Sequence, residues 1–239
     1  MYLGIDLGTS GVKAILIDAD QRLIGEAASQ PLSVARPQKG WSEQDPDLWW
    51  GAVCETLDAL RLRQPKAMAA VQGIGLSGQM YGATLLDAAD EVLRPCILWN
   101  DTRSHEEAAE LDGDPMFRRL TGNIVFPGFT APKLDWVRAH EPALWDKVAK
   151  VLLPKDYLRL WLTGDHVAEM SDAAGTSWLD TGARDWSDDL LAATGLSRSH
   201  MPRLVEGSAV SGTLRTELAR RWGLPAGVVI AGGGGDNAA

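Results

Sequence analysis

The chain opens with MYLGIDLGTSGVKAILID (residues 1–18), and this stretch decides the fold. Two apolar runs, residues 1–6 and 12–18, flank a turn that contains Gly8 and Gly11. Apolar runs broken by glycine are typical of strands joined by a tight turn. We therefore expect two strands here. A second turn at residues 18–21 predicts a third strand from residue 22 to about residue 28.

The rest of the chain mixes helical and strand signals. Residues 29–44 contain two prolines and show no hydrophobic periodicity, which predicts a loop. A helix then begins with Asp45 at its N-cap and Pro46 at its first position, and its apolar face is formed by Trp49, Val53, Leu57 and Leu60. Further strands are expected at residues 71–77, 81–86, 92–98, 166–171 and 227–231. Further helices are expected at 103–112, 131–148 (interrupted near Pro142), 154–163, 187–195 and 213–222. This order predicts a mixed sheet flanked by helices.

The composition is that of a folded acidic domain. Of 239 residues, 45% are hydrophobic and 23% are charged, which excludes a disordered chain. The net charge of −9 argues against a nucleic-acid partner, because phosphates would be repelled. The longest uncharged stretch, residues 67–86, contains four glycines and two glutamines and is therefore a poor membrane span. Without a signal peptide before the first apolar run, we expect a soluble cytoplasmic protein with no membrane partner.

The first candidate site is the turn after Asp6. Its glycines let backbone N–H groups converge, and hydroxyl donors and a cation surround it: Gly8, Thr9, Ser10 and Lys13. Polyphosphate oxygens need such donors, and Asp6 is placed to hold Mg²⁺, which prefers oxygen ligands. The alternative interpretation is a glycine-containing hairpin capped by an aspartate.

The second candidate site is the run of four glycines at residues 232–235, followed by Asp236. Glycines let a ligand approach the backbone closely. Phosphoryl transfer to an alcohol needs one carboxylate that accepts the hydroxyl proton, and Asp236 can supply it. The alternative is that Asp236 is only the N-cap of a helix that starts at Asn237.

The third candidate site follows two strand ends, at residues 78–82 and 98–103. Ligands of α/β folds lie beyond strand ends. Amides and carboxylates bind hydroxyls and aromatic faces bind C–H groups, so this mixture suits a polyol. The candidate contacts are Met80, Tyr81, Trp99 and Asp101. The alternative is that Trp99 belongs to the core and Asp101 caps a helix.

Several longer motifs show a resemblance to a known family. They lie at residues 1–13, 41–46, 97–101, 127–134, 152–160, 171–176 and 233–239. The chain resembles the N-terminal half of a carbohydrate kinase of the FGGY family, and within that family the kinases of pentuloses. The first and last motifs are shared across the family, the middle ones are more specific, and the match covers essentially the whole chain.

The resemblance implies an actin-like ATPase, ribonuclease-H-like α/β domain. Such a domain has a mixed sheet of the five-stranded type that is flanked by helices. It also has an inserted region that contributes to the sugar site. Residues 1–235 would form the sugar-binding N-terminal domain and residues 236–239 the start of an interdomain helix. The C-terminal nucleotide domain of the family is absent from this chain, so we expect the isolated chain to be inactive. The resemblance is also compatible with a homodimer of the full-length enzyme.

The resemblance also implies roles for the candidate residues. Asp236 would be the general base and Asp6 would act on Mg²⁺ through water, while the phosphates of ATP would contact Gly8, Thr9, Ser10 and Lys13. The sugar would contact Met80 and Tyr81, with further contacts at Trp99, Asp101 and Asn237. The implied reaction converts ATP and D-xylulose to ADP and D-xylulose 5-phosphate.

One departure from the family pattern concerns the substrate. Pentulose kinases usually have histidine where Tyr81 stands, and a phenol reaches further than an imidazole. A different ketose or polyol is therefore an alternative substrate. A fragment of an actin- or chaperone-like ATPase is a second alternative, which the polyol site argues against. A sugar-binding module without catalysis is a third, but it leaves the phosphate turn unexplained.

Overall fold

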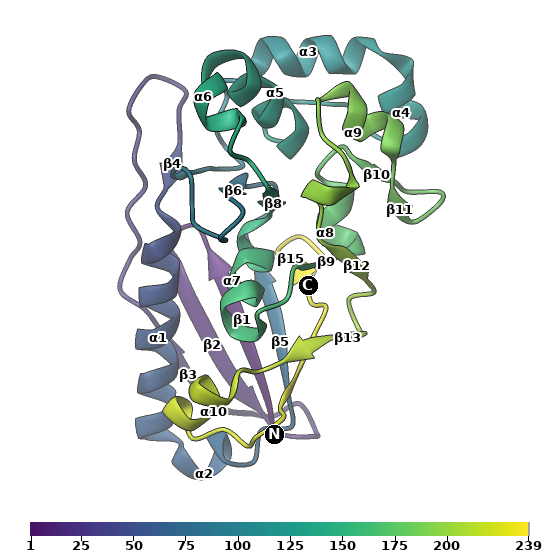
Figure 1. Ribbon diagram of the computed structural model, residues 1–239. Coiled ribbons are helices and arrows are strands. Elements are labelled where there is room, and N and C mark those ends of the chain that lie inside the picture. Colours follow the sequence, from purple (N-terminus) through teal and green to yellow (C-terminus); the bar gives the residue numbers. More distant parts are fainter. Residues whose placement is uncertain (239) are drawn as a thin grey trace.

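The central sheet begins with an antiparallel meander of β1 (Tyr2–Gly8), β2 (Gly11–Ile17) and β3 (Leu23–Ala28). The computed structural model describes residues 1–238 (Figure 1). Strand β5 (Gly73–Gly78) lies parallel to β1, and β14 (Val229–Ala231) lies parallel to β5. These five strands form the expected mixed sheet. Two short strands enlarge it, namely β13 (Val210–Thr213), antiparallel to β14, and β15 (Gly234–Gly235), which pairs with the end of β5.

One face of the sheet is apolar because side chains alternate along each strand. On β1, Leu3, Ile5 and Leu7 are buried, and β2 contributes Val12, Ala14 and Leu16 to the same core. Helix α1 (Pro46–Arg63) runs along this side of the sheet (Figure 1). Helices α7 (Pro154–Thr163) and α10 (Thr216–Trp222) complete the core against α1.

Helix α1 confirms the expected start signals. The Asp45 carboxylate accepts a hydrogen bond of 3.0 Å from the backbone nitrogen of Asp47, and Pro46 is the first helical residue. The predicted apolar face is buried completely: Trp49, Val53, Leu57 and Leu60 are each 0% exposed.

A second core lies in the region inserted between β5 and β14. It is built from α3 (His105–Gly113), α4 (Pro115–Thr121), α5 (Thr130–His140), α6 (Pro142–Trp145) and α9 (Asp188–Ala193), which gather at the top of the molecule in Figure 1. Their apolar side chains enclose Phe117, Leu134 and Trp178. This region agrees with the expected insertion, and the break before Pro142 was also expected. The domain boundary at residue 235 stays a prediction.

The strands expected at 81–86 and 92–98 were predicted too long. Strand β6 (Thr84–Leu86) pairs with β8 (Lys150–Leu152), and β7 (Cys96–Ile97) pairs with β4 (Glu43–Gln44), which lies in the expected loop. Across the turn at 87–90, Leu86 and Val92 form an isolated bridge. Local alternation could not reveal these pairings, because the partners are more than 50 residues away in the chain.

Several other short elements were not expected or differ in their bounds. The strand expected at 166–171 is β9 (Val167–Glu169), because the Glu169 carboxylate caps helix α8 (Met170–Ala174). Residues 236–238 form a turn where a helix start was expected, and residue 239 lies outside the described residues. The remaining elements are α2 (Pro65–Met68), β10 (Leu179–Asp180), β11 (Asp185–Trp186), a 3₁₀ turn (Arg198–His200) and β12 (Arg203–Val205).

No helix within residues 1–238 is long and apolar enough to cross a membrane.

We expect the substitution Asp45→Ala to lower the free energy of unfolding by about 1 kcal/mol, because the N-cap acceptor of α1 is lost. Urea denaturation followed by circular dichroism measures this change. The control is Asp20→Ala, which removes an exposed ion pair with Arg22 and should cost about 0.5 kcal/mol or less. Equal losses in the two variants would contradict the capping role.

Candidate active site

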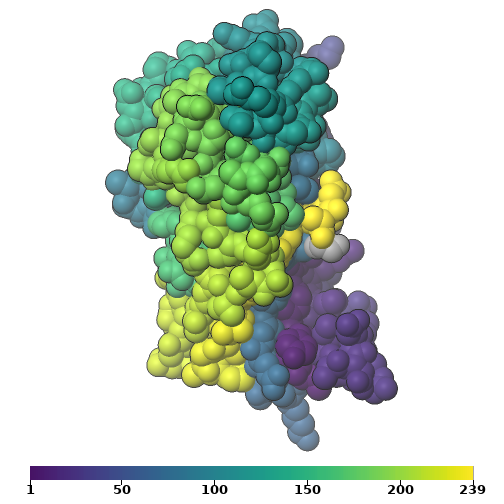
Figure 2. Space-filling view, turned by 90° about the vertical axis from the view of Figure 1, so that its right-hand side faces the viewer, coloured from purple at the N-terminus to yellow at the C-terminus, as the bar shows by residue number. Residues whose placement is uncertain are grey.

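A cleft of about 840 Å³ lies on the face of the sheet opposite α1. Its floor is formed by the second set of alternating residues on β1, β2 and β5, namely Gly4, Asp6, Lys13, Ile15, Gly75 and Ser77. Its wall is formed by the start of α8 and the glycine-rich segment before Asp236. In Figure 2 the C-terminal residues, in yellow, lie where the upper helical region meets the purple N-terminal strands.

The predicted phosphate turn joins β1 and β2 at the edge of this cleft. Asp6 on β1 stands opposite Lys13 on β2, and both line the cleft. Gly8 pairs with Gly11, and Ser10 at the tip is exposed. Thr9 differs from its neighbours, because its side chain is bonded to Gln79 and Trp99.

The glycine-rich segment approaches β5 so closely that side chains are excluded. A Cβ atom on Gly233 would lie 2.0 Å from the Leu76 carbonyl oxygen, and one on Gly232 would lie 2.3 Å from the Glu206 carbonyl oxygen. The next residues pair with the end of β5, where the Asp236 nitrogen donates to the Gly78 oxygen at 3.0 Å. This pairing anchors Asp236 beside the ends of β1 and β5.

The Asp236 carboxyl is influenced by Asp6. Partial burial raises the pKa of Asp236, and the negative charge of Asp6 raises it further. The structure therefore brings together two predicted site residues that are 230 positions apart in the sequence. Asn237 follows in the exposed turn.

Tyr81 has a backbone conformation that is rare for a bulky residue. Its φ is +64°, and its carbonyl oxygen accepts hydrogen bonds from the Lys133 Nζ at 2.7 Å and the Thr130 Oγ1 at 3.2 Å. Its ring packs edge-on against Phe129 and fills the space over Gly175, where a Cβ atom would lie 1.8 Å from the ring. Strain that is fixed from several sides is typical of ligand-binding positions.

The Tyr81 hydroxyl stays protonated at neutral pH. Burial raises its pKa, and the carboxylates of Asp172 and Asp236 raise it further. The preceding residue, Met80, is buried and packs against Gly235, where a Cβ atom would lie 2.8 Å from the methionine sulfur. Met80 and Tyr81 therefore lie close to the segment that carries Asp236, and their role as a sugar site stays a prediction.

Trp99 and Asp101 are placed differently, although they are neighbours in the sequence. The Trp99 side chain is 47% exposed. Asp101 is buried, and its carboxylate accepts hydrogen bonds from the Ser42 nitrogen and the Arg103 guanidinium. A sugar contact at Asp101 stays a prediction, and the structure shows its carboxylate engaged inside the protein.

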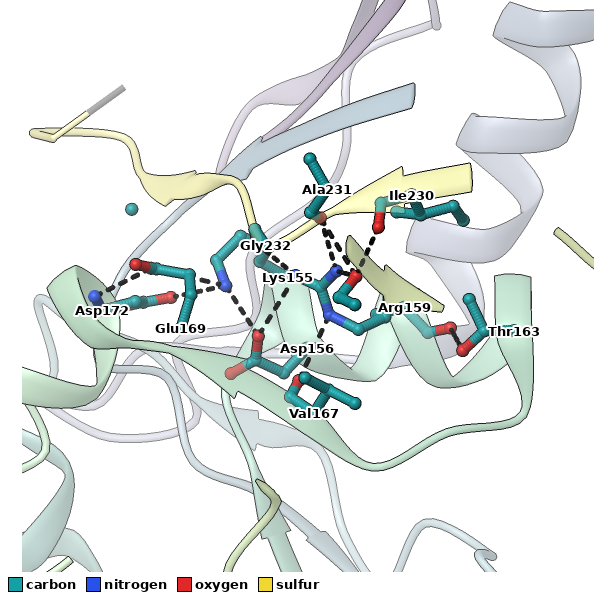
Figure 3. A network of polar contacts seen from close by, with 12 residues as sticks. Lys155, Asp156, Arg159, Thr163, Val167, Glu169, Asp172, Ile230, Ala231 and Gly232 are labelled. Atoms are coloured by element: carbon teal, nitrogen blue, oxygen red, sulfur yellow. Dashed lines mark hydrogen bonds and ion pairs between the residues drawn. The ribbon is translucent and has the colours of Figure 1, made fainter. Parts of the chain in front are cut away.

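A buried network of charged residues lies behind the glycine-rich segment and was not predicted (Figure 3). Arg159 donates to the carbonyl oxygens of Ala231 at 2.8 Å and Gly232 at 2.5 Å. These carbonyls lie where the glycine run that leads to Asp236 begins. Arg159 and the Ser211 hydroxyl thus satisfy backbone acceptors beside the glycine-rich segment.

The charges in this network do not balance if all its members are ionised. Two cations, Lys155 and Arg159, face three carboxyl groups, and all five residues are at most 1% exposed: Lys155, Asp156, Arg159, Glu169 and Asp172. Burial raises the pKa of Asp172 well above its usual range, although Lys155 opposes the shift. The signal in the sequence was the presence of charges at 155, 156 and 159 inside an otherwise apolar helix.

The metal-binding capacity of the site is limited. Within residues 1–238, no group of three or more histidine, cysteine, aspartate or glutamate side chains is arranged to hold a metal ion. Three carboxyl groups line the cleft, those of Asp6, Glu169 and Glu206, and a role of Asp6 in holding an ion through water stays a prediction.

The fold and the cleft place the chain in the class of actin-like ATPase domains. Residues 1–239 match the N-terminal domain of the FGGY family of carbohydrate kinases. The chain belongs to this family.

Two similar proteins illustrate the match. The xylulose kinase of Klebsiella pneumoniae is 55% identical over 240 residues, which are 100% of this chain and 49% of that protein. A crystal structure described as a xyloylose kinase from Brucella ovis has a TM-score of 0.97 and 65% identity, and the match covers 99% of this chain and 49% of the other. A Plasmodium falciparum glycerol kinase, at 19% identity and a TM-score of 0.89, shares the fold. The chain spans about half the length of the curated relatives it matches.

We expect Lys133 to make stability depend on pH. Burial lowers the pKa of Lys133 to about 7, whereas its unfolded value is near 10.5. Between these values the unfolded chain binds a proton that the folded chain does not, so stability rises with pH by at most about 1.4 kcal/mol per unit. The free energy of unfolding of the unaltered protein minus that of Lys133→Met should therefore increase from pH 7 to pH 10. Urea titrations at each pH measure it, and a constant difference would show that Lys133 stays protonated when folded.

Proposed function

We propose that this chain is the sugar-binding half of an ATP-dependent pentulose kinase that converts D-xylulose to D-xylulose 5-phosphate. The observation that carries the proposal is the position of Asp236. It follows glycines that line the cleft, its backbone is bonded to Gly78 at the end of β5, and its carboxylate has a pKa raised by burial and by the charge of Asp6. The relatives described as xylulose kinases support this choice of substrate.

Asp236 is the general base of the proposed reaction. It accepts the proton of the sugar hydroxyl that attacks the terminal phosphorus of ATP. A raised pKa makes the carboxylate a better proton acceptor. The hydrogen bond from the Asp236 nitrogen to Gly78 and the packed glycines hold the base in position, which lowers the entropy lost in the transition state.

The phosphate side of the proposed site is formed by the β1–β2 turn. Lys13 supplies a cation at the cleft, and Gly8 and the exposed Ser10 lie at the turn. Asp6 fits a Mg²⁺ ion held through water, because Mg²⁺ usually takes one or two carboxylates and completes its shell with water and phosphate oxygens. When bound, the ion would neutralise charge on the phosphates.

The sugar side of the proposed site is formed by Met80, Tyr81, Trp99 and Asn237, with Asp101 behind them. Tyr81 presents a protonated phenol near Asp236, so its hydroxyl can donate to a sugar oxygen. The half-exposed indole of Trp99 offers an apolar face for C–H groups.

The direct test uses the full-length protein that carries this chain, with ATP, Mg²⁺ and a panel of pentuloses. We expect phosphorylation of D-xylulose at a higher kcat/KM than for its epimers. Absence of phosphorylation for every pentulose would contradict the proposed function.

We expect Asp236→Asn to lower kcat by about 10²- to 10⁴-fold, because the proton acceptor is lost. The KM for the sugar should change little, since the amide keeps the shape of the carboxylate. Steady-state kinetics measures both constants. The control is Asp58→Asn, which alters a surface pair with Arg221 remote from the cleft. A kcat near that of the unaltered enzyme would reassign Asp236 to a structural role.

We expect Tyr81→Phe to lower kcat/KM for D-xylulose by about 5- to 150-fold, because one sugar hydroxyl loses its partner. The loss should be smaller for epimers at the contacted carbon. Comparing kcat/KM across a panel of pentuloses measures the difference. A small and equal loss for every sugar would show that Tyr81 has only a packing role and that its hydroxyl does not contact the sugar.

A further inference from the structure

A continuous run of hydrogen bonds connects the interior of the protein to Trp99. The Trp49 Nε1 donates to the Gln44 Oε1 at 2.7 Å, and the Gln79 Nε2 donates to the same oxygen at 3.1 Å. The Thr9 Oγ1 donates to the Gln79 Oε1 at 2.9 Å, and the Trp99 Nε1 donates to the Thr9 Oγ1 at 3.0 Å. Trp49, Gln44 and Gln79 are at most 1% exposed, so the two bonds that join them are shielded from water.

The direction of every bond in this run is determined by its two tryptophans. An indole N–H can only donate, so the Gln44 atom facing Trp49 must be its oxygen. That oxygen then requires Gln79 to present its NH₂ group, which leaves the Gln79 oxygen facing Thr9. The Thr9 hydroxyl must therefore donate to Gln79.

The other end of the run leads to the same assignment. The Trp99 N–H must donate, so the Thr9 oxygen must accept. The Gln44 NH₂ group donates to the carbonyl oxygens of Thr9 at 3.0 Å and Ser33 at 3.1 Å, which agrees with the orientation required by Trp49. All four amide hydrogen-bonding positions of Gln44 are thus used, and such a satisfied buried network is rigid.

A threonine hydroxyl has one hydrogen, and in this structure Gln79 receives it. The Thr9 side chain thus has no hydrogen left to donate to a phosphate oxygen. We propose that Thr9 is a positioning residue: its hydroxyl holds the indole of Trp99 in the sugar site, and it is not a ligand of the phosphates. This inference rests on the proposed function for the role of Trp99, and it replaces the phosphate contact expected at Thr9.

Trp99 needs such a tether because its side chain is about half exposed. On its backbone side, Gly128 approaches so closely that a Cβ atom would lie 2.7 Å from the Trp99 carbonyl oxygen. The backbone is thus fixed by packing, and the hydrogen bond to Thr9 fixes the orientation of the exposed ring. Gln79 directly precedes Met80 and Tyr81 in the chain. The same hydrogen-bond network therefore positions both parts of the proposed sugar site, residues 80–81 and Trp99.

The first experiment compares Thr9→Val with Thr9→Ser in the full-length protein. Valine has the shape of threonine without the hydroxyl, and serine keeps the hydroxyl. We expect Thr9→Val to raise the KM for D-xylulose by about 3- to 10-fold, as for the loss of one neutral hydrogen bond, with the KM for ATP changed by less than about twofold. Thr9→Ser should restore the KM for the sugar. Combined with Trp99→Phe, which lacks the indole N–H, Thr9→Val should cause little further loss.

The opposite pattern would overturn the inference. A raised KM for ATP with an unchanged KM for the sugar would make Thr9 a phosphate ligand, and fully additive effects of Thr9→Val and Trp99→Phe would exclude the tether.

The second experiment needs no catalysis, so it separates this inference from the proposed function. The indole N–H signal of Trp99 in a ¹⁵N NMR spectrum is identified by its loss in Trp99→Phe. We expect Thr9→Val to shift this signal and Thr9→Ser to leave it near its original position. The control is Trp186, whose indole donates to the Pro202 carbonyl oxygen and should not respond. An unshifted Trp99 signal in Thr9→Val would overturn the inference even in a protein that phosphorylates D-xylulose.

Discussion

The close approach of the glycine-rich segment to β5 is the constraint on which the site depends. A Cβ atom on Gly233 would lie 2.0 Å from the Leu76 carbonyl oxygen, so the chain can follow β5 only if that position has no side chain. Gly233 also has a φ of +77°, which glycine adopts without strain. Because β5 is paired with β1, this path brings Asp236 to the same end of the sheet as Asp6. The two carboxylates of the proposed reaction therefore meet because of backbone packing.

This packing has a consequence for the interior. The chain bends away from regular pairing after β14, and the carbonyl oxygens of Ala231 and Gly232 are satisfied by Arg159. A buried guanidinium needs nearby carboxylates, and these carboxylates need Lys155 as a second cation. The buried charge network thus follows from the position of the glycine-rich segment. Removing Lys155 or Arg159 would leave a buried carboxylate without its cation, so these charges act as a unit.

Features set by neighbouring residues in the chain could be predicted from the sequence. The β1–β2 turn and the N-cap of α1 depend on local residue types, and both were correct. The pairing of β6 with β8 could not be predicted, because it joins segments that periodicity does not relate. The same holds for side chains. Asp101 was expected in the sugar site because of its place after a strand, but Ser42 and Arg103, which engage its carboxylate, become visible only in the folded chain.

The two loops of the proposed sugar site are held by different kinds of interaction. Trp99 is held by a neutral hydrogen bond from its indole to Thr9, which does not change between pH 6 and pH 9. The Tyr81 carbonyl is held by Lys133, which also bonds the Gly128 carbonyl at 2.7 Å and has a pKa of about 7 because of its burial. When Lys133 loses its proton, charge-assisted bonds become ordinary ones, which are about half as strong. The strained conformation of Tyr81 is therefore supported most strongly below neutral pH. The position of Trp99 does not depend on pH. Any change in sugar preference with pH should accordingly arise at Tyr81 and not at Trp99.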